Sequence, residues 1–365
     1  MKHVLKPSAE NIRVLIITGL CSFSSFTYGA SGAKLIDNVN EFFAPHGTEV
    51  TKALYPRAET ARQILAAQSG VGVNKFLHNP TLAPTDNQPV VRMNRDAYYS
   101  KAVVNVSEGA TITLPDVPEG AYISMQPVTE DHRPQAMSYG PGTYELATHT
   151  GSHLIVIIRL DSNFSPAQAK KYQQDIVITA GSDKPFYTPQ YEKSSFSRVE
   201  NQLKADIVNL VKKEGRLALS TSLFSSPTDE TRGLYRPEKN QVAAAIGWGG
   251  ALAKDNIYET SPNFPATGCY QLTFEDPKNK HFWSITVYNK AGFMFNDVAN
   301  VNSYHAKANA DGTYTVSMGC GQQSPNNIPI ENDSGVFSIT ARHYGPSERV
   351  LKDGYRLVPL IKKVK

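Results

Sequence analysis

The sequence is poor in cysteine, in long apolar runs and in charge of one sign. Its three cysteines include no C-x-x-C pair, so it lacks the spacing of a zinc or dithiol redox site. The 37 basic and 33 acidic residues nearly cancel, to a net charge of +4, and no basic cluster stands out. This argues against a protein that binds nucleic acid or an anionic membrane mainly by charge. G-x-S-x-G and H-E-x-x-H are also absent, which removes the usual support for a serine hydrolase or a zinc protease.

The composition is that of a folded protein. Hydrophobic residues supply 40% of the chain and charged residues 19%, enough apolar material for a core. A length of 365 residues fits two or three domains. The 18 tyrosines favour β-structure and offer polar aromatic groups to a ligand.

The N-terminus is typical of a secretory signal. Basic residues up to Arg13 precede a short apolar run, Val14–Phe26, and small residues follow it. Because a membrane span needs about 20 apolar residues, a membrane anchor is the weaker alternative. The sequence therefore predicts a signal peptide over residues 1–30, cleaved near Gly29 or Ala30. The mature protein is expected to be secreted or periplasmic, with no transmembrane segment.

Removal of that segment would leave two cysteines, Cys269 and Cys320. Oxidising compartments favour disulfides. Both residues belong to strands predicted to be neighbours, and each follows a glycine that lets two backbones approach closely. We predict a disulfide between them, with two separately buried thiols as the alternative.

Two regions have a helical pattern. Residues 34–68 are expected to be helical, because Pro56 suits a first turn and apolar residues follow it at helical spacing. Farther along, Ser197 and Glu200 form an S-x-x-E capping box, an apolar stripe follows, and Gly215 ends it.

The remaining regions are rich in β-formers, in short runs broken by Gly, Pro and Asp. The runs are 110–115, 121–127, 153–161, 175–180, 269–276, 281–289, 312–319 and 335–344. This spacing favours antiparallel sheets over βαβ units. We predict a mainly β fold with helical subdomains, consisting of two antiparallel β-sandwich domains, jelly-roll-like, plus N-terminal and central helices. The predicted segments are a signal peptide (1–30), an N-terminal helical segment (31–89), a first sandwich (90–185), a central helical segment (186–250) and a second sandwich (251–365).

Two stretches resemble known families. Val90–Val128 resembles the domain-of-unknown-function 1254 (DUF1254) family, whose motifs match Asn94, Asp96, Tyr99, Pro115, Asp116, Pro118 and Tyr122. Gly268–Asp297 resembles the domain-of-unknown-function 1214 (DUF1214) family, whose strand motif matches Phe282, Trp283, Ser284, Thr286 and Tyr288. The resemblance implies β-sandwich domains with helical subdomains, in this order in one exported chain. It implies no activity.

The densest group of polar and aromatic residues is Asn94, Asp96, Tyr98 and Tyr99. Their amide, carboxylate and phenol groups suit the hydroxyls of a sugar or the amides of a peptide, so they are candidate ligand-binding residues. The alternative is structural, with Asp96 accepting backbone N–H bonds at a strand entry. Glu130 and His132, at the end of the next strand, could add acid–base groups, although a polar turn explains them as well.

The strand around Trp283 has two different faces. Trp283, Ile285 and Val287 share one face, which is expected to pack in a core. Ser284, Thr286 and Tyr288 share the other.

These observations leave three classes of function open. We favour a protein that binds a small organic or carbohydrate-like ligand in an aromatic and polar pocket. The alternatives are a hydrolase with carboxylate or histidine acid–base groups, and a structural or assembly subunit of the cell envelope. The sequence predicts no nucleic-acid partner and no metal site, names no cofactor, and leaves a homo-oligomer open.

Overall fold

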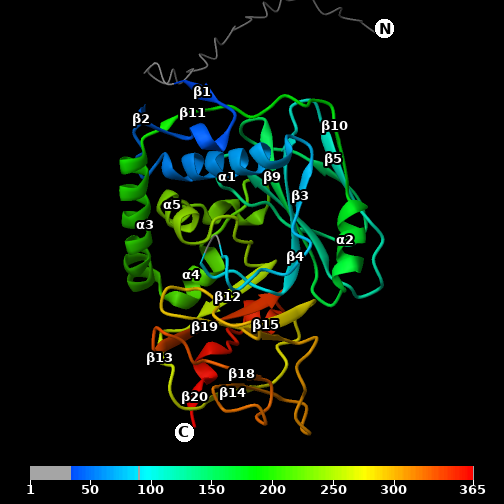
Figure 1. Ribbon diagram of the computed structural model, residues 1–365, viewed down its shortest axis with the longest axis vertical. Coiled ribbons are helices and arrows are strands. Elements are labelled where there is room, and N and C mark those ends of the chain that lie inside the picture. The colour runs from blue at the N-terminus through cyan, green and yellow to red at the C-terminus, as the bar shows by residue number, and fades with distance from the viewer. Residues whose placement is uncertain (1–33, 89–90, 365) are drawn as a thin grey trace, which may run out of the picture. The chain divides into compact units, whose positions relative to one another are not determined.

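The computed structural model describes residues 34–88 and 91–364 (Figure 1). The predicted signal peptide lies outside them. The helices described are α1 (Tyr55–Val71), α2 (Pro166–Gln174), α3 (Lys193–Glu214), α4 (Arg216–Ser222), α5 (Pro237–Gly247) and α6 (Glu348–Leu351), with 3-10 turns η1 (Val39–Glu41), η2 (Glu230–Leu234) and η3 (Val358–Leu360). Within these two ranges, no helix is both long and apolar enough to cross a bilayer.

The first β region has two sheets that enclose one hydrophobic core. The larger sheet has the order β3 (Phe76–His78), β4 (Ala97–Asn105), β9 (His153–Asp161), β6 (Ile123–Thr129) and β7 (Ser138–Tyr139). The smaller sheet has the order β10 (Val177–Ala180), β5 (Ala110–Leu114) and β8 (Gly142–Leu146). Side chains from β4, β9 and β6 meet side chains from β5 and β8 in this core. Strand β9 is buried along its whole length. One of its faces lies in this core, and the opposite face is covered as well.

The helices cover that other face of the larger sheet. Val103, Val128 and Ile155 point away from the smaller sheet and pack with apolar residues of α1, α3 and α5. These side chains alternate with the core residues of the same strands, as the period of two along a strand requires. The β4–β9–β6 sheet is therefore the middle layer of three (Figure 1).

The second β region also encloses a core between two sheets. One sheet has the order β12 (Asn256–Thr260), β19 (Val336–Tyr344), β15 (Phe282–Tyr288) and β16 (Asn300–Asn302), and β13 (Phe264–Pro265) also pairs with β19. The other has the order β18 (Asn327–Ile328), β17 (Tyr314–Met318), β14 (Tyr270–Phe274) and β20 (Lys362–Lys363). Trp283, Ile285 and Val287 lie in the core, as predicted.

The mainly β fold with helical subdomains is confirmed, while the jelly-roll arrangement stays a prediction. The β-runs correspond closely to strands: 153–161 is β9, and 335–344 contains β19. A two-stranded sheet of β1 (Leu35–Ile36) and β11 (Thr188–Pro189) completes the described strands, together with β2 (Phe43–Thr48).

The helix expected over residues 34–68 is wrong in its first half. β1, η1 and β2 precede α1, which begins only at Tyr55. β2 contains Pro45, which cannot donate in a helix interior, and Gly47. A Cβ atom on Gly47 would lie 2.4 Å from the carbonyl carbon of Tyr191, so the glycine lets β2 run close beside the chain before α3. Tertiary contact decides the structure of this segment.

The capping box expected at Ser197 and Glu200 is also wrong. α3 begins at Lys193, so Ser197 lies inside the helix, while Gly215 ends it as predicted. A capping box forms instead at α2, where the Ser165 side chain accepts from the Gln168 N–H and the Gln168 side chain accepts from the Ser165 N–H. The S-x-x-E pattern is short enough to occur inside a helix without capping it.

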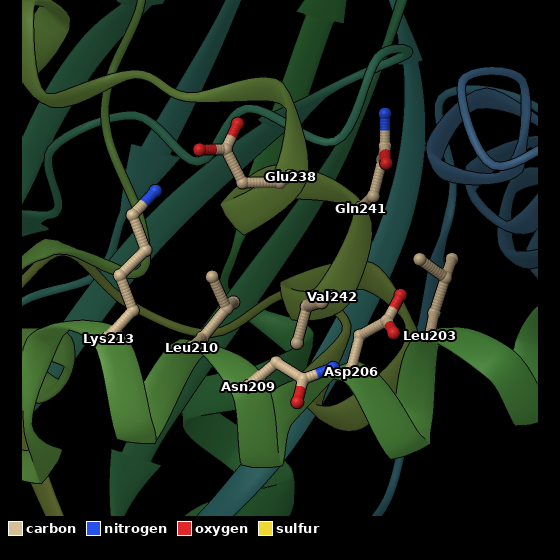
Figure 2. A pocket seen from close by; sticks show the side chains of 8 residues that line it. All are labelled: Leu203, Asp206, Asn209, Leu210, Lys213, Glu238, Gln241 and Val242. Carbon is tan, nitrogen blue, oxygen red and sulfur yellow. The ribbon is translucent and has the colours of Figure 1, made fainter.

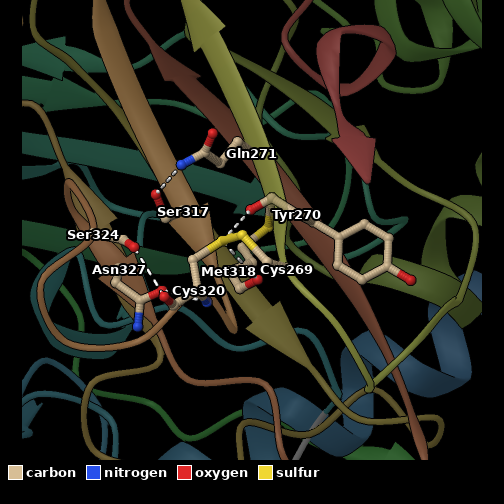
Figure 3. Close-up of a disulfide and its surroundings, with 8 residues drawn as sticks. All are labelled: Cys269, Tyr270, Gln271, Ser317, Met318, Cys320, Ser324 and Asn327. Atoms are coloured by element: carbon tan, nitrogen blue, oxygen red, sulfur yellow. Dashed lines mark hydrogen bonds between the residues drawn. A yellow bond between two sulfur atoms is a disulfide. The ribbon is translucent and has the colours of Figure 1, made fainter. Parts of the chain in front are cut away.

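A disulfide joins Cys269 and Cys320 in the second β region (Figure 3). Cys269 directly precedes β14, and Cys320 follows β17, the strand that pairs with β14. The two Cα atoms are 4.5 Å apart. A Cβ atom on Gly319 would lie 2.7 Å from the Gly268 carbonyl oxygen, so this close approach requires the glycine.

Candidate functional site

Three strands of the larger sheet align a row of polar side chains on the face turned toward the helices. Arg159 of β9 lies directly opposite Tyr99 of β4 on one side and Ser124 of β6 on the other. Directly paired residues of antiparallel strands point to the same face. The row therefore places a guanidinium between a phenol and a hydroxyl.

Arg159 is 5% exposed, and its surroundings are aromatic. Its Nη1 lies 3.8 Å from the Met137 sulfur, and its guanidinium carbon is 5.7 Å from the centre of the Tyr99 ring. No carboxylate of the described residues forms an ion pair with it. Burial opposes its charge, but nearby phenol groups, led by Tyr99 and Tyr122, hold its pKa above the ordinary value.

More tyrosines approach this row from other elements. The rings of Tyr122 and Tyr344 are 5.9 Å apart, and those of Tyr122 and Tyr139 are 6.2 Å apart. Tyr258, on β12, is close enough to influence the charge of Arg159. We call Arg159 and these tyrosines the tyrosine–arginine cluster; its members are Tyr99, Tyr122, Tyr139, Arg159, Tyr258 and Tyr344. Burial raises the pKa of Tyr122, Tyr139 and Tyr344, so these phenols keep their protons.

Asp96 connects the cluster to the second β region. Its side chain is fully buried and accepts hydrogen bonds from Ser284 Oγ (2.6 Å), Asn300 Nδ2 (3.0 Å) and the Tyr344 hydroxyl (3.2 Å). Burial raises the pKa of Asp96, while Arg342 and these donors oppose the rise. The polar face of β15, which carries Ser284, is thus buried against the first β region.

The buried Arg342 beside Asp96 is fully engaged. Its Nη1 donates to Thr286 Oγ1 (2.9 Å), and its Nη2 donates to the Tyr288 hydroxyl (2.7 Å) and the Arg92 carbonyl oxygen (2.9 Å). Burial opposes its charge, but the phenols of Tyr288 and Tyr344 and the charge of Asp96 raise its pKa above the ordinary value. This arginine has a structural role, because it joins three segments of the chain.

The structure brings together three of the predicted site residues and separates the fourth. Asn94 Nδ2 donates to the Tyr99 hydroxyl (2.9 Å), and Asn94 Oδ1 accepts from the Asp96 N–H (3.2 Å). Tyr98 points to the opposite face of β4, where its hydroxyl donates to the Phe164 carbonyl oxygen (2.9 Å). The period of two along the strand separates Tyr98 from Tyr99.

Glu130 and His132 lie away from the cluster, in contacts that shape loops. Glu130 Oε1 accepts from the N–H groups of Ser152 (2.8 Å) and His153 (3.0 Å). His132 is fully buried, with a left-handed backbone (φ 62°), and its Nε2 accepts from the Gly249 N–H (3.1 Å). Its ring lies 5.9 Å from that of Trp248. His132 thus anchors the glycine-rich 247–251 segment.

We expect His132 to make the protein sensitive to mild acid. Burial lowers its pKa to about 4, against about 6.5 in the unfolded chain. Between pH 6.5 and 4, His132 is protonated in the unfolded chain but not in the folded protein. The free energy of unfolding therefore falls as the pH falls, by up to about 3 kcal/mol. Urea unfolding at pH 7, 6, 5 and 4 measures this.

The matched variant is His132→Asn, because asparagine tolerates the left-handed backbone. Its unfolding free energy should fall less steeply across this range. Some slope should persist, because burial also lowers the pKa of His281 to about 4. Equal slopes for the variant and the wild type would contradict the assignment.

Sequence reasoning did not single out as site residues Tyr122, Tyr139, Arg159, Tyr258 or Tyr344 of the cluster, nor the structural residue Arg342. Arg159 and Arg342 each interrupt an otherwise apolar or small-residue strand, in HLIVIIRLD and SITARHY. The sequence did contain a signal for both arginines, because each lies within a run that reads as a buried strand. A buried charge needs specific partners, so it marks a candidate site.

Two surface hollows lie elsewhere. A groove of about 190 Å³ between α3 and α5 has an apolar floor of Leu203, Leu210 and Val242 with polar and charged residues around it (Figure 2). A wider hollow of about 700 Å³ lies beside the disulfide and includes Gln271, Ser324 and Glu331 in its lining. Neither contains a member of the tyrosine–arginine cluster. In residues 34–88 and 91–364, no three His, Cys, Asp or Glu side chains are grouped to hold a metal ion.

Family models match both β regions. The model described as "Protein of unknown function (DUF1254)" matches residues 73–179, and that described as "Protein of unknown function (DUF1214)" matches residues 259–348. The first match contains Asp96, Tyr99 and Arg159, and the second contains Ser284 and Arg342. The contacts around Asp96 therefore join the two matched regions.

One solved structure shows a similar fold. The VPA0106 protein from Vibrio parahaemolyticus is 18% identical, with a TM-score of 0.62 over 86% of this chain and 98% of that one. An uncharacterized protein from Burkholderia cenocepacia is 12% identical, with a TM-score of 0.49 over 86% of this chain and 87% of that one. No curated protein matches the chain. The chain contains a DUF1254 region followed by a DUF1214 region, in the tandem order that its motifs predicted.

Proposed function

We propose that the protein binds a small organic ligand at the tyrosine–arginine cluster. The observation that carries the proposal is the meeting of polar aromatic side chains from both β regions around a buried guanidinium. Tyr99, Tyr139 and Tyr258 are only half-buried, so the cluster is not sealed from its surroundings. Aromatic surface with a few polar groups is typical of sites for small oxygen-rich compounds, carbohydrate-like ones included.

Packing alone accounts poorly for this composition. Burying the Arg159 guanidinium costs free energy unless its N–H groups find hydrogen-bond partners. A site that meets a ligand there provides such partners.

The hydrolase alternative receives no specific support. Ser284 Oγ donates to Asp96, and no hydrogen bond within the described residues joins either side chain to a histidine. An activated serine needs a base that accepts its proton, and Asp96 also accepts hydrogen bonds from Asn300 and Tyr344. We therefore assign Asp96 a positioning role, since its carboxylate holds Tyr344 in the cluster.

Thermal unfolding with a panel of neutral sugars, amides, esters and small acids tests the proposal. At least one class should raise the melting temperature of the wild type by several degrees, because ligands that bind the folded state stabilise it. The same compound should act less on Tyr99→Phe and Tyr258→Phe.

Tyr172→Phe is the matched control, because Tyr172 lies on α2, outside the cluster. It should respond as the wild type does. The proposal fails if no compound shifts the wild type, or if the shift is equal in all three variants.

A further inference from the structure

We infer that the ligand carries a carboxylate, which Arg159 and the neighbouring phenols bind directly. This inference rests on the proposed function and names the chemistry of its ligand. It follows from a contrast between arginines, from the hydrogen-bond donors grouped with Arg159, and from the local balance of charge.

The buried arginines of the described residues differ in their partners. Arg133 donates to the carbonyl oxygens of Ser225 and Ser226, both at 2.8 Å. Arg342 donates to Thr286, Tyr288 and the Arg92 carbonyl oxygen. Arg159 has one polar contact, to the thioether sulfur of Met137 at 3.8 Å. A thioether is a weak acceptor, so most of the five N–H groups of this guanidinium have no acceptor in the described residues.

Two carboxylates near Arg159 accept hydrogen bonds from other groups. Asp255 Oδ1 accepts from the Tyr139 hydroxyl (2.9 Å), and its Oδ2 accepts from the Met137 N–H (3.2 Å). Asp161, two positions along β9 on the same face as Arg159, accepts from the N–H groups of Tyr122 and Asn163. The chain thus places acids near Arg159 but commits their oxygens elsewhere.

The neighbouring phenols add further donors. The Tyr99 hydroxyl accepts from Asn94, the Tyr122 hydroxyl from Ser124, and the Tyr258 hydroxyl from Asn256. Each phenol oxygen therefore receives a hydrogen bond, and its own proton has no acceptor in these contacts. A guanidinium and three phenol O–H groups together form a site of donors, and an oxygen-rich acceptor is its complement.

The charge balance favours a monoanion. One carboxylate neutralises one guanidinium and matches its two parallel N–H groups. A phosphate dianion would bring more negative charge than a carboxylate close to Asp255 and Asp161. We therefore assign the site to a carboxylate, such as that of an organic or sugar acid.

The test compares sodium propionate with propionamide and sodium chloride at constant ionic strength. Propionate should raise the melting temperature of the wild type in a concentration-dependent way, whereas propionamide and chloride should not. Arg159→Met should abolish the shift, and Arg198→Met, which changes an exposed arginine, should keep it. Sodium phosphate serves as the competing anion and should give a smaller shift.

The unliganded variants give a second measurement. Arg159→Met should melt at or above the wild-type temperature, because it replaces an unpaired buried cation by an apolar side chain. Arg342→Met should melt several degrees lower, since it removes the hydrogen bonds to Thr286, Tyr288 and the Arg92 carbonyl oxygen. If the melting temperature of Arg159→Met falls as far as that of Arg342→Met, the inference is overturned, because Arg159 would then be a structural residue.

Two further outcomes overturn the carboxylate assignment. One is a wild-type melting temperature that does not change with propionate, acetate or formate, or that rises more with phosphate than with propionate. The other is a propionate shift that persists in Arg159→Met. If neutral compounds still act on the wild type through Tyr99, the proposed function stands and only this inference fails.

Discussion

Asp96→Ala is expected to cause the largest loss of stability of any single substitution considered. The change leaves Ser284, Asn300 and Tyr344 without their acceptor and removes a negative charge that acts on Arg342. Removing one partner from a buried charged network costs about 3–5 kcal/mol. Urea unfolding of wild type and variant measures the difference.

Asp96→Asn separates the contribution of the negative charge of Asp96 from that of its hydrogen bonds. Asparagine keeps the shape and one acceptor but lacks the charge, so we expect a smaller loss of about 1–3 kcal/mol. Asp116→Ala is the control, since Asp116 is exposed, and it should lie within about 0.5 kcal/mol of the wild type. An Asp96→Ala protein as stable as this control would show that the contact between the two β regions does not depend on the carboxylate.

Loss of the disulfide is expected to be nearly as costly. Cys269 and Cys320 are 51 positions apart, and closing a loop of that length stabilises the folded state by about 4 kcal/mol in the chain-entropy model. The Cys269→Ser, Cys320→Ser double variant should lose free energy of unfolding on this scale. Reductant should destabilise the wild type similarly and leave the double variant unchanged.

Counting thiols checks the same bond chemically. Unfolded, unreduced protein should expose one thiol, Cys21, while residues 1–30 are attached, and none once they are removed. Two additional thiols, or a wild type indifferent to reductant, would contradict the pairing.

Local pattern was sufficient for much of the fold. The run HLIVIIRLD predicts β9 because β-branched residues favour strands, and Gly215 ends α3 because glycine adopts the required backbone freely. Local pattern failed at residues 34–54, where pairing with the chain near Tyr191 overrides a weak helical signal. It also misplaced the start of α3, because S-x-x-E carries little information without its surroundings.

Local pattern also selected some residues that the structure places at the candidate site and others that it places elsewhere. Asn94, Asp96 and Tyr99 are close in sequence, so composition alone identified them. Glu130 and His132 are chemically similar, yet their hydrogen bonds go to Ser152, His153 and Gly249. Whether a polar side chain meets a ligand or a backbone amide depends on what the fold places against it.

The sequence by itself determined a mainly β tandem chain, its family motifs and the choice of core face along β15. Alternation and turn residues are local properties, so they can be read along the chain. The tertiary structure decided that Arg159 lacks the partners that Arg342 has, and that Tyr99, Tyr122, Tyr258 and Tyr344 meet around it. These residues come from strands far apart in sequence, and a side chain's partners across two packed sheets are set only when the sheets come together.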